Sequence, residues 1–77
     1  KRYINKKDNL NGIGILKLLV TVGFCQSNSE ARQNILNNAI RIDDQIVEDP
    51  KTIIQIDNIS QIKLSFGKKK HILVYFK

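Results

Sequence analysis

Seventy-seven residues suffice for one small domain, and 42% of them are apolar, mostly isoleucine, leucine and valine. Thirteen basic residues against seven acidic ones give a net charge of +6, which favours a nucleic acid as partner over an anionic membrane. One cysteine excludes an internal disulfide, and with one histidine it cannot build a zinc site. We therefore expect neither a metal nor a cofactor in this domain.

The longest apolar run, from Ile13 to Val22, is interrupted by Gly14, Lys17 and Thr21. A membrane-spanning helix needs about 20 consecutive apolar residues, so we expect no membrane segment. The sequence contains no methionine, even at position 1, and we expect it to be one domain of a longer protein.

Residues 1–12 are polar and basic, and they predict a linker or a short N-terminal strand around Tyr3 and Ile4. We expect the folded domain to cover residues 13–77.

The stretch from Ile13 to Val22 has the composition of a buried helix. Leucines and valines surround most of the helix axis, whereas Lys17 and Thr21 fall on one narrow stripe at about 100° per residue. The pattern predicts a helix that is buried on nearly every side and exposed along that stripe. Gly23 suits the left-handed position that ends such a helix.

A second helix is predicted over residues 27–36. Ser27 and Glu30 have the S-x-x-E spacing of a capping box, in which a hydroxyl and a carboxylate bind free N–H groups at a helix start. Asn37 and Asn38 suit its end, because asparagine tolerates the left-handed conformation. The short connection to the first helix predicts a compact helix pair.

The second helix carries an arginine on its apolar side. With Glu30 at 0°, the apolar residues Ala31, Ile35 and Leu36 lie at about 100°, 140° and 240°. Arg32 lies at about 200°, inside this apolar arc. Two alternatives follow: Arg32 extends along the surface to a nearby carboxylate, or it meets a partner molecule.

The apolar period changes to two after the second helix. Residues 40–46 predict a tight hairpin that turns at Asp43 and Asp44. Residues 61–77 predict a second hairpin around Gly67 and its lysines.

Residues 52–60 fit either a short strand or a turn. The order of elements, helices first and strands after, predicts an α+β domain. In this domain a two-helix motif packs on a small, mostly antiparallel sheet of four to five strands.

No combination of residues has the spacing of an active site. His71 lies beside three lysines without an acidic neighbour in the sequence, which favours a structural or exposed role over general-base catalysis. Cys25 is interpreted as a small buried filler between the helices. Asp43 and Asp44 are adjacent and are interpreted as turn residues, because adjacent strand residues point to opposite faces. We expect no catalytic residue here.

Cations and hydrogen-bond donors gather around the second helix. Lys17 lies on the exposed stripe of the first helix, and we expect Arg41 to share a surface with Arg32. The N-terminus of the second helix, with the Ser29 hydroxyl, suits a phosphate. Together with the lysine run 68–70, these groups suit a phosphate backbone better than a base edge.

The segment LLVTVGFCQSNSEARQNILNNAIRIDDQIV resembles the S-four-like, or alpha-L, RNA-binding domain. The most specific part of the match is the S-x-S-E-A-R pattern between Ser27 and Arg32. Asn28 and Gln33 stand where the family pattern carries basic residues, and Asp43-Asp44 stands where it carries an Asn-Gly turn.

Two further segments, GILKLL and IKLSFGKKKHILVYFK, resemble the form of this domain at the C-terminus of bacterial-type tyrosyl-tRNA synthetases. The resemblance implies an appendage that grips tRNA(Tyr) at its variable arm and anticodon stem. It also implies an upstream catalytic domain, outside this sequence, which uses ATP and Mg²⁺. The alternative is the RNA-anchoring domain of a pseudouridine synthase or a ribosome-associated factor. A further alternative is a domain that binds a protein or a membrane surface through the lysine run 68–70 of the second hairpin.

From the residues and the resemblance together we expect a monomeric domain, a homodimeric parent protein and a bacterial cytoplasmic location, with a mitochondrial one as the alternative. The residues predicted to contact RNA are Lys17, Ser27, Asn28, Ser29, Arg32, Gln33, Arg41, Lys68, Lys69 and Lys70.

Overall fold

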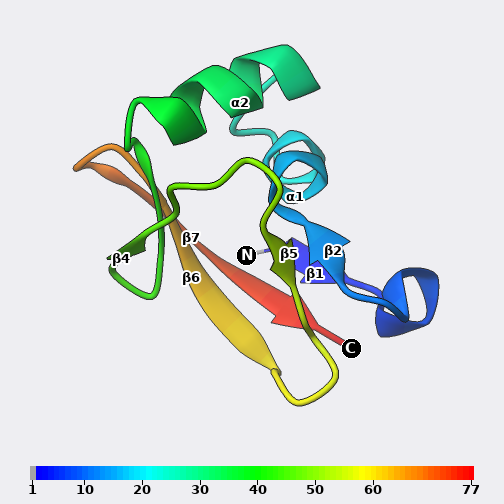
Figure 1. Cartoon of the computed structure of the whole chain (residues 1–77). Helices are drawn as coiled ribbons and strands as arrows, with labels where there is room; N and C mark the ends of the chain where they lie inside the picture. The colour runs from blue at the N-terminus through cyan, green and yellow to red at the C-terminus, as the bar shows by residue number, and fades with distance from the viewer. Residues whose placement is uncertain (1) are drawn as a thin grey trace.

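A computed structural model describes residues 2–77 of the chain (Figure 1). Within these residues it confirms the α+β class: two helices accompany a five-stranded sheet and a separate two-stranded sheet. The elements in chain order are β1 (Arg2–Ile4), the 3₁₀ turn η1 (Lys6–Asn9), β2 (Ile13–Gly14), α1 (Ile15–Thr21), α2 (Asn28–Leu36), β3 (Ile40–Ile42), β4 (Gln45–Ile46), β5 (Ile53–Ile54), β6 (Gln61–Phe66) and β7 (Lys70–Phe76).

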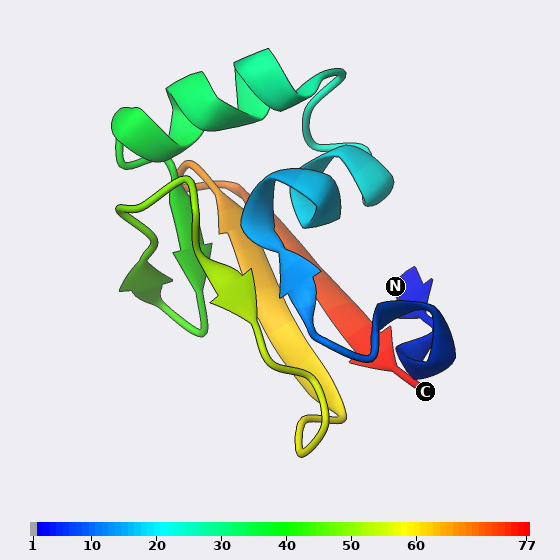
Figure 2. The same cartoon turned by 45° about the vertical axis from the view of Figure 1, so that its right-hand side comes forward.

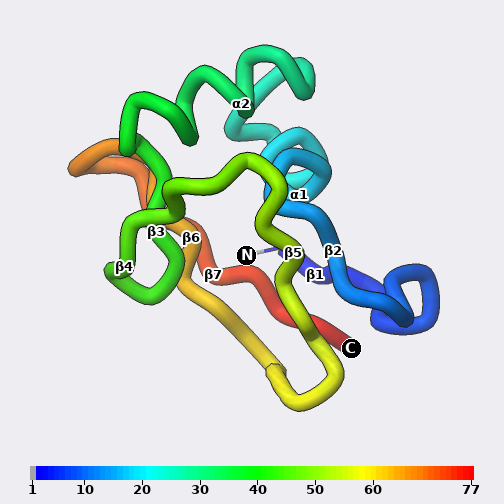
Figure 3. Tube along the Cα trace, in the orientation of Figure 1, coloured from blue at the N-terminus to red at the C-terminus, as the bar shows by residue number. Residues whose placement is uncertain are grey.

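The larger sheet has the strand order β1-β7-β6-β3-β4 and is mostly antiparallel, as predicted. Only the β1–β7 pair is parallel among its four pairings in residues 2–77. This pair places the first described residues beside the end of the chain (Figure 3). The Lys77 N–H donates to the Ile4 carbonyl at 3.0 Å, and the Lys6 N–H donates to the Lys77 carbonyl at 2.8 Å.

The prediction that the first helix begins at Ile13 was wrong by two residues. Ile13 and Gly14 form strand β2, which pairs with β5, and the helix begins at Ile15. The physical reason lies at Gly12, which has a φ of +92° and sits against β5. A Cβ at this position would lie 2.7 Å from the Ile54 carbonyl oxygen, so the chain can approach β5 there only as glycine.

The core lies between the helix pair and one face of the larger sheet. Helix α1 buries Ile15, Leu18 and Leu19, while Lys17 and Thr21 stay exposed, as the predicted stripe requires. From a second angle, α1 and the β2–β5 ribbon lie in front of the sheet and α2 crosses above (Figure 2). The sheet contributes alternating residues to this core, including Ile40, Ile62, Leu64, Val74 and Phe76.

Several predicted turns are confirmed by left-handed backbone angles. Gly23 ends α1 with a φ of +86°, and Asn38 follows α2 with a φ of +59°. In the β3–β4 hairpin both central residues are left-handed, Asp43 at +50° and Asp44 at +72°, as a two-residue hairpin turn requires. Aspartate tolerates this conformation better than most residues, because its short polar side chain finds local hydrogen bonds.

The other face of the larger sheet carries the alternate residues of its strands. In register across three strands lie Arg41, Ser65 and His71, and two residues along β6 and β7 lie Lys63 and Leu73. Tyr3, on β1, stands beside Tyr75 on β7 at the end of this face. We call this surface the open face of the sheet.

Candidate nucleic-acid interface

The start of α2 is held by a side-chain cap. The Ser27 hydroxyl accepts a hydrogen bond from the Glu30 N–H at 3.2 Å, which confirms one half of the predicted capping box. The Glu30 carboxylate accepts from the Gln26 N–H at 2.9 Å, one residue before Ser27. These bonds fix the helix start, where the exposed Asn28 and Ser29 lie beside backbone N–H groups.

The buried side of α2 is narrower than the helical wheel predicts. Ala31 and Ile35 are fully buried, whereas Leu36 is 57% exposed. Arg32 lies one turn before Leu36 and is also exposed, so its predicted place inside the apolar arc was wrong. The reason is that only Ala31 and Ile35 of this helix belong to the hydrophobic core. Within residues 2–77, no ion pair engages Arg32, which leaves its guanidinium available to a partner.

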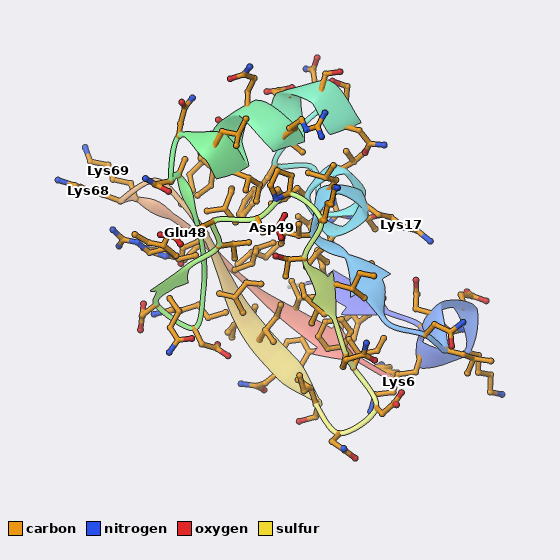
Figure 4. The ribbon with its side chains drawn as sticks, viewed as in Figure 1. Lys6, Lys17, Glu48, Asp49, Lys68 and Lys69 are labelled. Carbon is orange, nitrogen blue, oxygen red and sulfur yellow. The ribbon has the colours of Figure 1, made fainter. Side chains whose placement is uncertain are left out.

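The lysine run lies at the far end of α2. The Gly67 N–H donates to the Ala39 carbonyl at 2.8 Å, which holds the β6–β7 turn beside the end of the helix. The Lys70 amine lies 5.7 Å from the centre of the Phe66 ring, and Lys68 and Lys69 are exposed. In Figure 4, Lys68 and Lys69 extend outward from this tip. The structure therefore joins α2 and the lysine tip into one surface, which we call the α2–tip surface.

Two predicted contacts lie away from the α2–tip surface. Arg41 sits on the open face of the sheet, because it alternates with Ile40 and Ile42, which face the core. The expectation that it shares a surface with Arg32 was therefore wrong: the sheet separates them. The Lys17 amine donates to the Asn9 side chain at 3.5 Å, and Lys17 points away from the tip in Figure 4.

A separate part of the surface is an acidic depression. It has a volume of about 410 Å³ and opens beside β4 and the segment that follows. Its lining includes Asp43, Glu48 and Asp49, and no basic side chain among the described residues lines it. In Figure 4, Asp49 lies near the middle of the view and Glu48 lies between it and the tip, whereas Lys68 and Lys69 extend outward. A phosphate backbone is repelled from the depression.

Ser65, His71 and Cys25 are residue types that often act in catalysis, but their surroundings in this fold indicate structural roles or simple exposure. The Ser65 hydroxyl lies 2.8 Å from His71 Nδ1, but Ser65 is 1% exposed, so no substrate can reach its oxygen. His71 is exposed, in line with the prediction of a structural or exposed role. Cys25 is buried and its Sγ accepts from the Asn34 amide at 3.5 Å. Burial raises the pKa of the Cys25 thiol, which keeps it protonated and unreactive.

The sequence did not predict two exposed features of the molecule. One is the exposure of Leu36 beside Arg32, for which the sequence holds no signal, because exposure depends on which distant segments pack against the helix. The other is a pair of stacked rings, Tyr3 and Tyr75, on the open face. The alternation of Tyr75 against Val74 and Phe76 places it on that face, but its pairing with Tyr3 depends on the parallel register of β1.

Neither a metal site nor a membrane helix is found in the described part of the chain. No three of its His, Cys, Asp and Glu side chains gather closely enough to hold a metal ion. None of the helices in residues 2–77 is long and apolar enough to cross a membrane.

Comparison with known proteins gives one family. Residues 4–74 match the family model of the tyrosine–tRNA ligase SYY-like C-terminal domain. The tyrosine–tRNA ligase of Bartonella quintana is 50% identical over 74 residues, which cover 92% of this chain and 18% of that protein. The ligases of Mesorhizobium japonicum and Brucella abortus are 52% and 38% identical, over 82% and 92% of this chain and 16% and 18% of those proteins. The chain thus spans less than a fifth of the length of these relatives. With most of its length matched, the chain belongs to the family of tyrosine–tRNA ligase SYY-like C-terminal domains.

Proposed function

We propose that this chain is the tRNA-binding end of a tyrosine–tRNA ligase, and that it grips tRNA(Tyr) through its phosphate backbone. The observation that carries the proposal is the match of residues 4–74 to the C-terminal domain of such ligases. The net charge of +6 and the α2–tip surface support it. The variable arm and the anticodon stem are the proposed points of contact.

The α2–tip surface supplies the groups that such a contact needs. The capped start of α2 offers N–H groups and the hydroxyls of Ser27 and Ser29. Arg32 adds a guanidinium in the middle that makes no ion pair within residues 2–77, and the lysine tip adds three amines beside the other end of the helix. Asn28 and Gln33 are exposed and extend the row with neutral donors. Phosphate contacts of this kind fix position and do not read bases.

The ligase reaction itself belongs to the rest of the parent protein in this proposal. ATP, Mg²⁺ and tyrosine would be bound by an upstream catalytic domain, and this chain would raise the affinity for tRNA. A pseudouridine synthase or ribosome-associated parent is not favoured, because the relatives described above are all named tyrosine–tRNA ligases.

The proposal is tested by titrating the 77-residue chain with tRNA(Tyr) at several salt concentrations. We expect weak binding that falls steeply between about 50 and 200 mM salt, because phosphate contacts release counterions. Arg32→Ala should weaken binding about tenfold, the loss of one charge-assisted contact.

A matched control is Lys51→Ala, which also removes one exposed cation but lies in the acidic segment after β4. Its effect should be much smaller than that of Arg32→Ala. Absence of binding at low salt, or binding that salt does not weaken, would contradict the proposed function. Equal effects of the two variants would show that net charge alone, and not the α2–tip surface, governs affinity.

A further inference from the structure

The open face of the sheet ends in two stacked aromatic rings. The ring centres of Tyr3 and Tyr75 lie 5.4 Å apart, with 25° between the ring planes. Tyr3 is 58% exposed, although it lies in a strand of the main sheet. A side chain this exposed contributes little to the core, and an exposed ring on a strand that pairs with β7 is a platform for another flat group.

Two lysines lie beside the Tyr3 ring. The Lys77 amine lies 4.0 Å from the centre of the Tyr3 ring. Lys77, Lys7 and Asn5 line a hollow of about 260 Å³ together with Tyr3 and Ile4. Among residues 2–77, no acidic side chain lines this hollow. The site therefore combines one aromatic ring, two amines and an amide, which is the donor set for a flat base with a phosphate next to it.

The size and chemistry of the hollow favour a nucleotide over a protein partner. Its volume is below the range of about 300–1,000 Å³ typical of drug-sized ligands, so it suits one base-sized group. Lysines are depleted at protein–protein interfaces, because burying an amine there is costly. A phosphate, by contrast, is neutralised by the amines as it binds.

The hollow is separate from the α2–tip surface. Tyr75 lies five residues after Lys70 along β7, which corresponds to about 17 Å of extended strand. The two sites also lie on different sides of the molecule, since Tyr3 and Tyr75 point away from the core that α1 and α2 cover. One chain of this size, 30 × 22 × 20 Å, can thus touch an RNA at two places.

We propose that the Tyr3 end of the open face is a second RNA contact, where an unpaired base stacks on the Tyr3 ring and the amines of Lys7 and Lys77 hold the adjoining phosphates. This inference rests on the proposed function in one respect, that RNA is the partner. It adds a preference for single-stranded nucleotides, which the α2–tip surface does not require. The Lys77 amine moves aside when the base occupies the ring.

The chain carries its own reporter for this contact, because its only two tyrosines form the pair and it has no tryptophan. A short oligouridylate should quench the tyrosine fluorescence of the 77-residue chain as it binds. A blunt RNA duplex of the same length should bind with much less quenching, since its bases are already stacked and paired.

The ring is tested by two substitutions that leave the net charge unchanged. Tyr3→Leu should weaken oligouridylate binding about tenfold, within the range for loss of one base–aromatic stack. Tyr3→Phe, which keeps the ring, should bind as the parent chain does. Affinity is measured by the anisotropy of labelled RNA, and circular dichroism checks that each variant is folded.

The amines are tested by Lys77→Gln and Lys7→Gln, with Lys51→Gln as the matched loss of one exposed cation elsewhere. We expect the first two to weaken oligouridylate binding more than the third. All three lysines are exposed, so these variants should fold. They therefore test the RNA contact at the hollow even if Tyr3→Leu fails to fold.

Equal oligouridylate binding by Tyr3→Leu and the parent chain, or unchanged tyrosine fluorescence on binding, would overturn the inference. If Arg32→Ala still weakens tRNA binding in that case, the proposed function stands without the second contact. If the open-face variants instead weaken binding to the remainder of the parent protein and leave RNA binding intact, the face docks protein and the inference is wrong.

Discussion

At the scale of single residues, two glycines show how closely the backbone of β2 approaches β5. Gly12 and Gly14 flank Ile13 but meet different surroundings. A Cβ at Gly12 would lie 2.7 Å from the Ile54 carbonyl oxygen and 2.9 Å from Ile53, and the φ there is +92°. A Cβ at Gly14 would meet no atom of the described chain within 4 Å, and the φ there is −66°.

Gly12→Ala should therefore lower the free energy of unfolding by about 3 kcal/mol, through left-handed strain and overpacking against β5. Gly14→Ala is the control and should change it by less than about 1 kcal/mol, because reduced chain entropy and a weaker helix cap oppose each other. Urea unfolding of both variants measures the difference. Similar costs at the two positions would contradict the close approach of Gly12 to β5.

A second prediction at this scale concerns how the stability that Asp44 contributes changes with pH. The hydrogen bond and charge of the Lys63 amine, 2.8 Å away, hold the pKa of Asp44 below its usual value. A carboxyl whose pKa is lower in the folded than in the unfolded chain stabilises the fold at pH values above its unfolded pKa of about 3.9. This stabilisation is lost as the pH falls through the folded pKa. Asp44→Asn should thus be less stable than the parent chain at neutral pH and equally stable in strong acid.

Thermal unfolding of both proteins from neutral pH into strong acid measures this convergence. Lys63→Gln removes the partner, and in that background Asp44→Asn should have a smaller effect at neutral pH. A difference in stability between the parent chain and the Asp44→Asn variant that persists unchanged into acid would show that the ion pair with Lys63 is not its cause.

At the scale of elements, α2 depends on its first turn. Nine residues are too few for a stable isolated helix, so the cap and the packing of Ala31 and Ile35 hold it. Ser27→Ala removes the hydroxyl that accepts the Glu30 N–H and should cost about 1 kcal/mol of unfolding free energy. Ser29→Ala is the control, because the Ser29 hydroxyl caps no N–H of the helix within residues 2–77, and it should cost much less.

Chemical denaturation compares the two serine variants, and amide hydrogen exchange locates the effect. Faster exchange confined to α2 in Ser27→Ala is the expected pattern. Equal stability of the two variants would indicate that tertiary packing alone maintains the helix start. Because a frayed first turn no longer holds the free N–H groups at Asn28 and Ser29 in place for a phosphate, Ser27→Ala should also weaken tRNA binding.

At the scale of the whole molecule, charge is distributed unevenly. Lysines occupy the β6–β7 tip, whereas acidic residues line the depression beside β4. Orientation on an RNA then follows from the field of the molecule as well as from single contacts. The tip should contribute strongly, since its three lysines are all exposed.

Replacing Lys68, Lys69 and Lys70 together by glutamine should reduce the steepness of the salt dependence of tRNA binding. Each lost phosphate contact lowers the slope of log affinity against log salt by about 0.9 on a duplex, so the expected loss is about 2 to 3. Affinities at several salt concentrations give the slope. A lower affinity with an unchanged slope would indicate that these lysines do not contact phosphates.

The sequence by itself determined the local structure. Ser27 with Glu30, Gly23, Asn38 and the Asp43-Asp44 turn act within a few residues, through hydrogen bonds and backbone angles that chain neighbours decide. The alternation of apolar residues likewise predicted both hairpins, because side chains on a strand point to opposite faces at every step. The family resemblance rested on the same short patterns.

Only the tertiary structure decided which surfaces these elements form. The parallel register of β1 on β7 brings Tyr3 beside Tyr75, 72 residues apart in the chain (75 − 3). The packing of β2 on β5 shortens α1, and α2 packs on the core only through its Ala31–Ile35 side, which leaves Arg32 and Leu36 exposed. Such contacts depend on distant segments meeting, and neither periodicity nor spacing encodes which distant segment is met. That is why the helix cap and the strand face of Arg41 were predictable, whereas the place of α2 and Arg32 on the other side of the sheet was not.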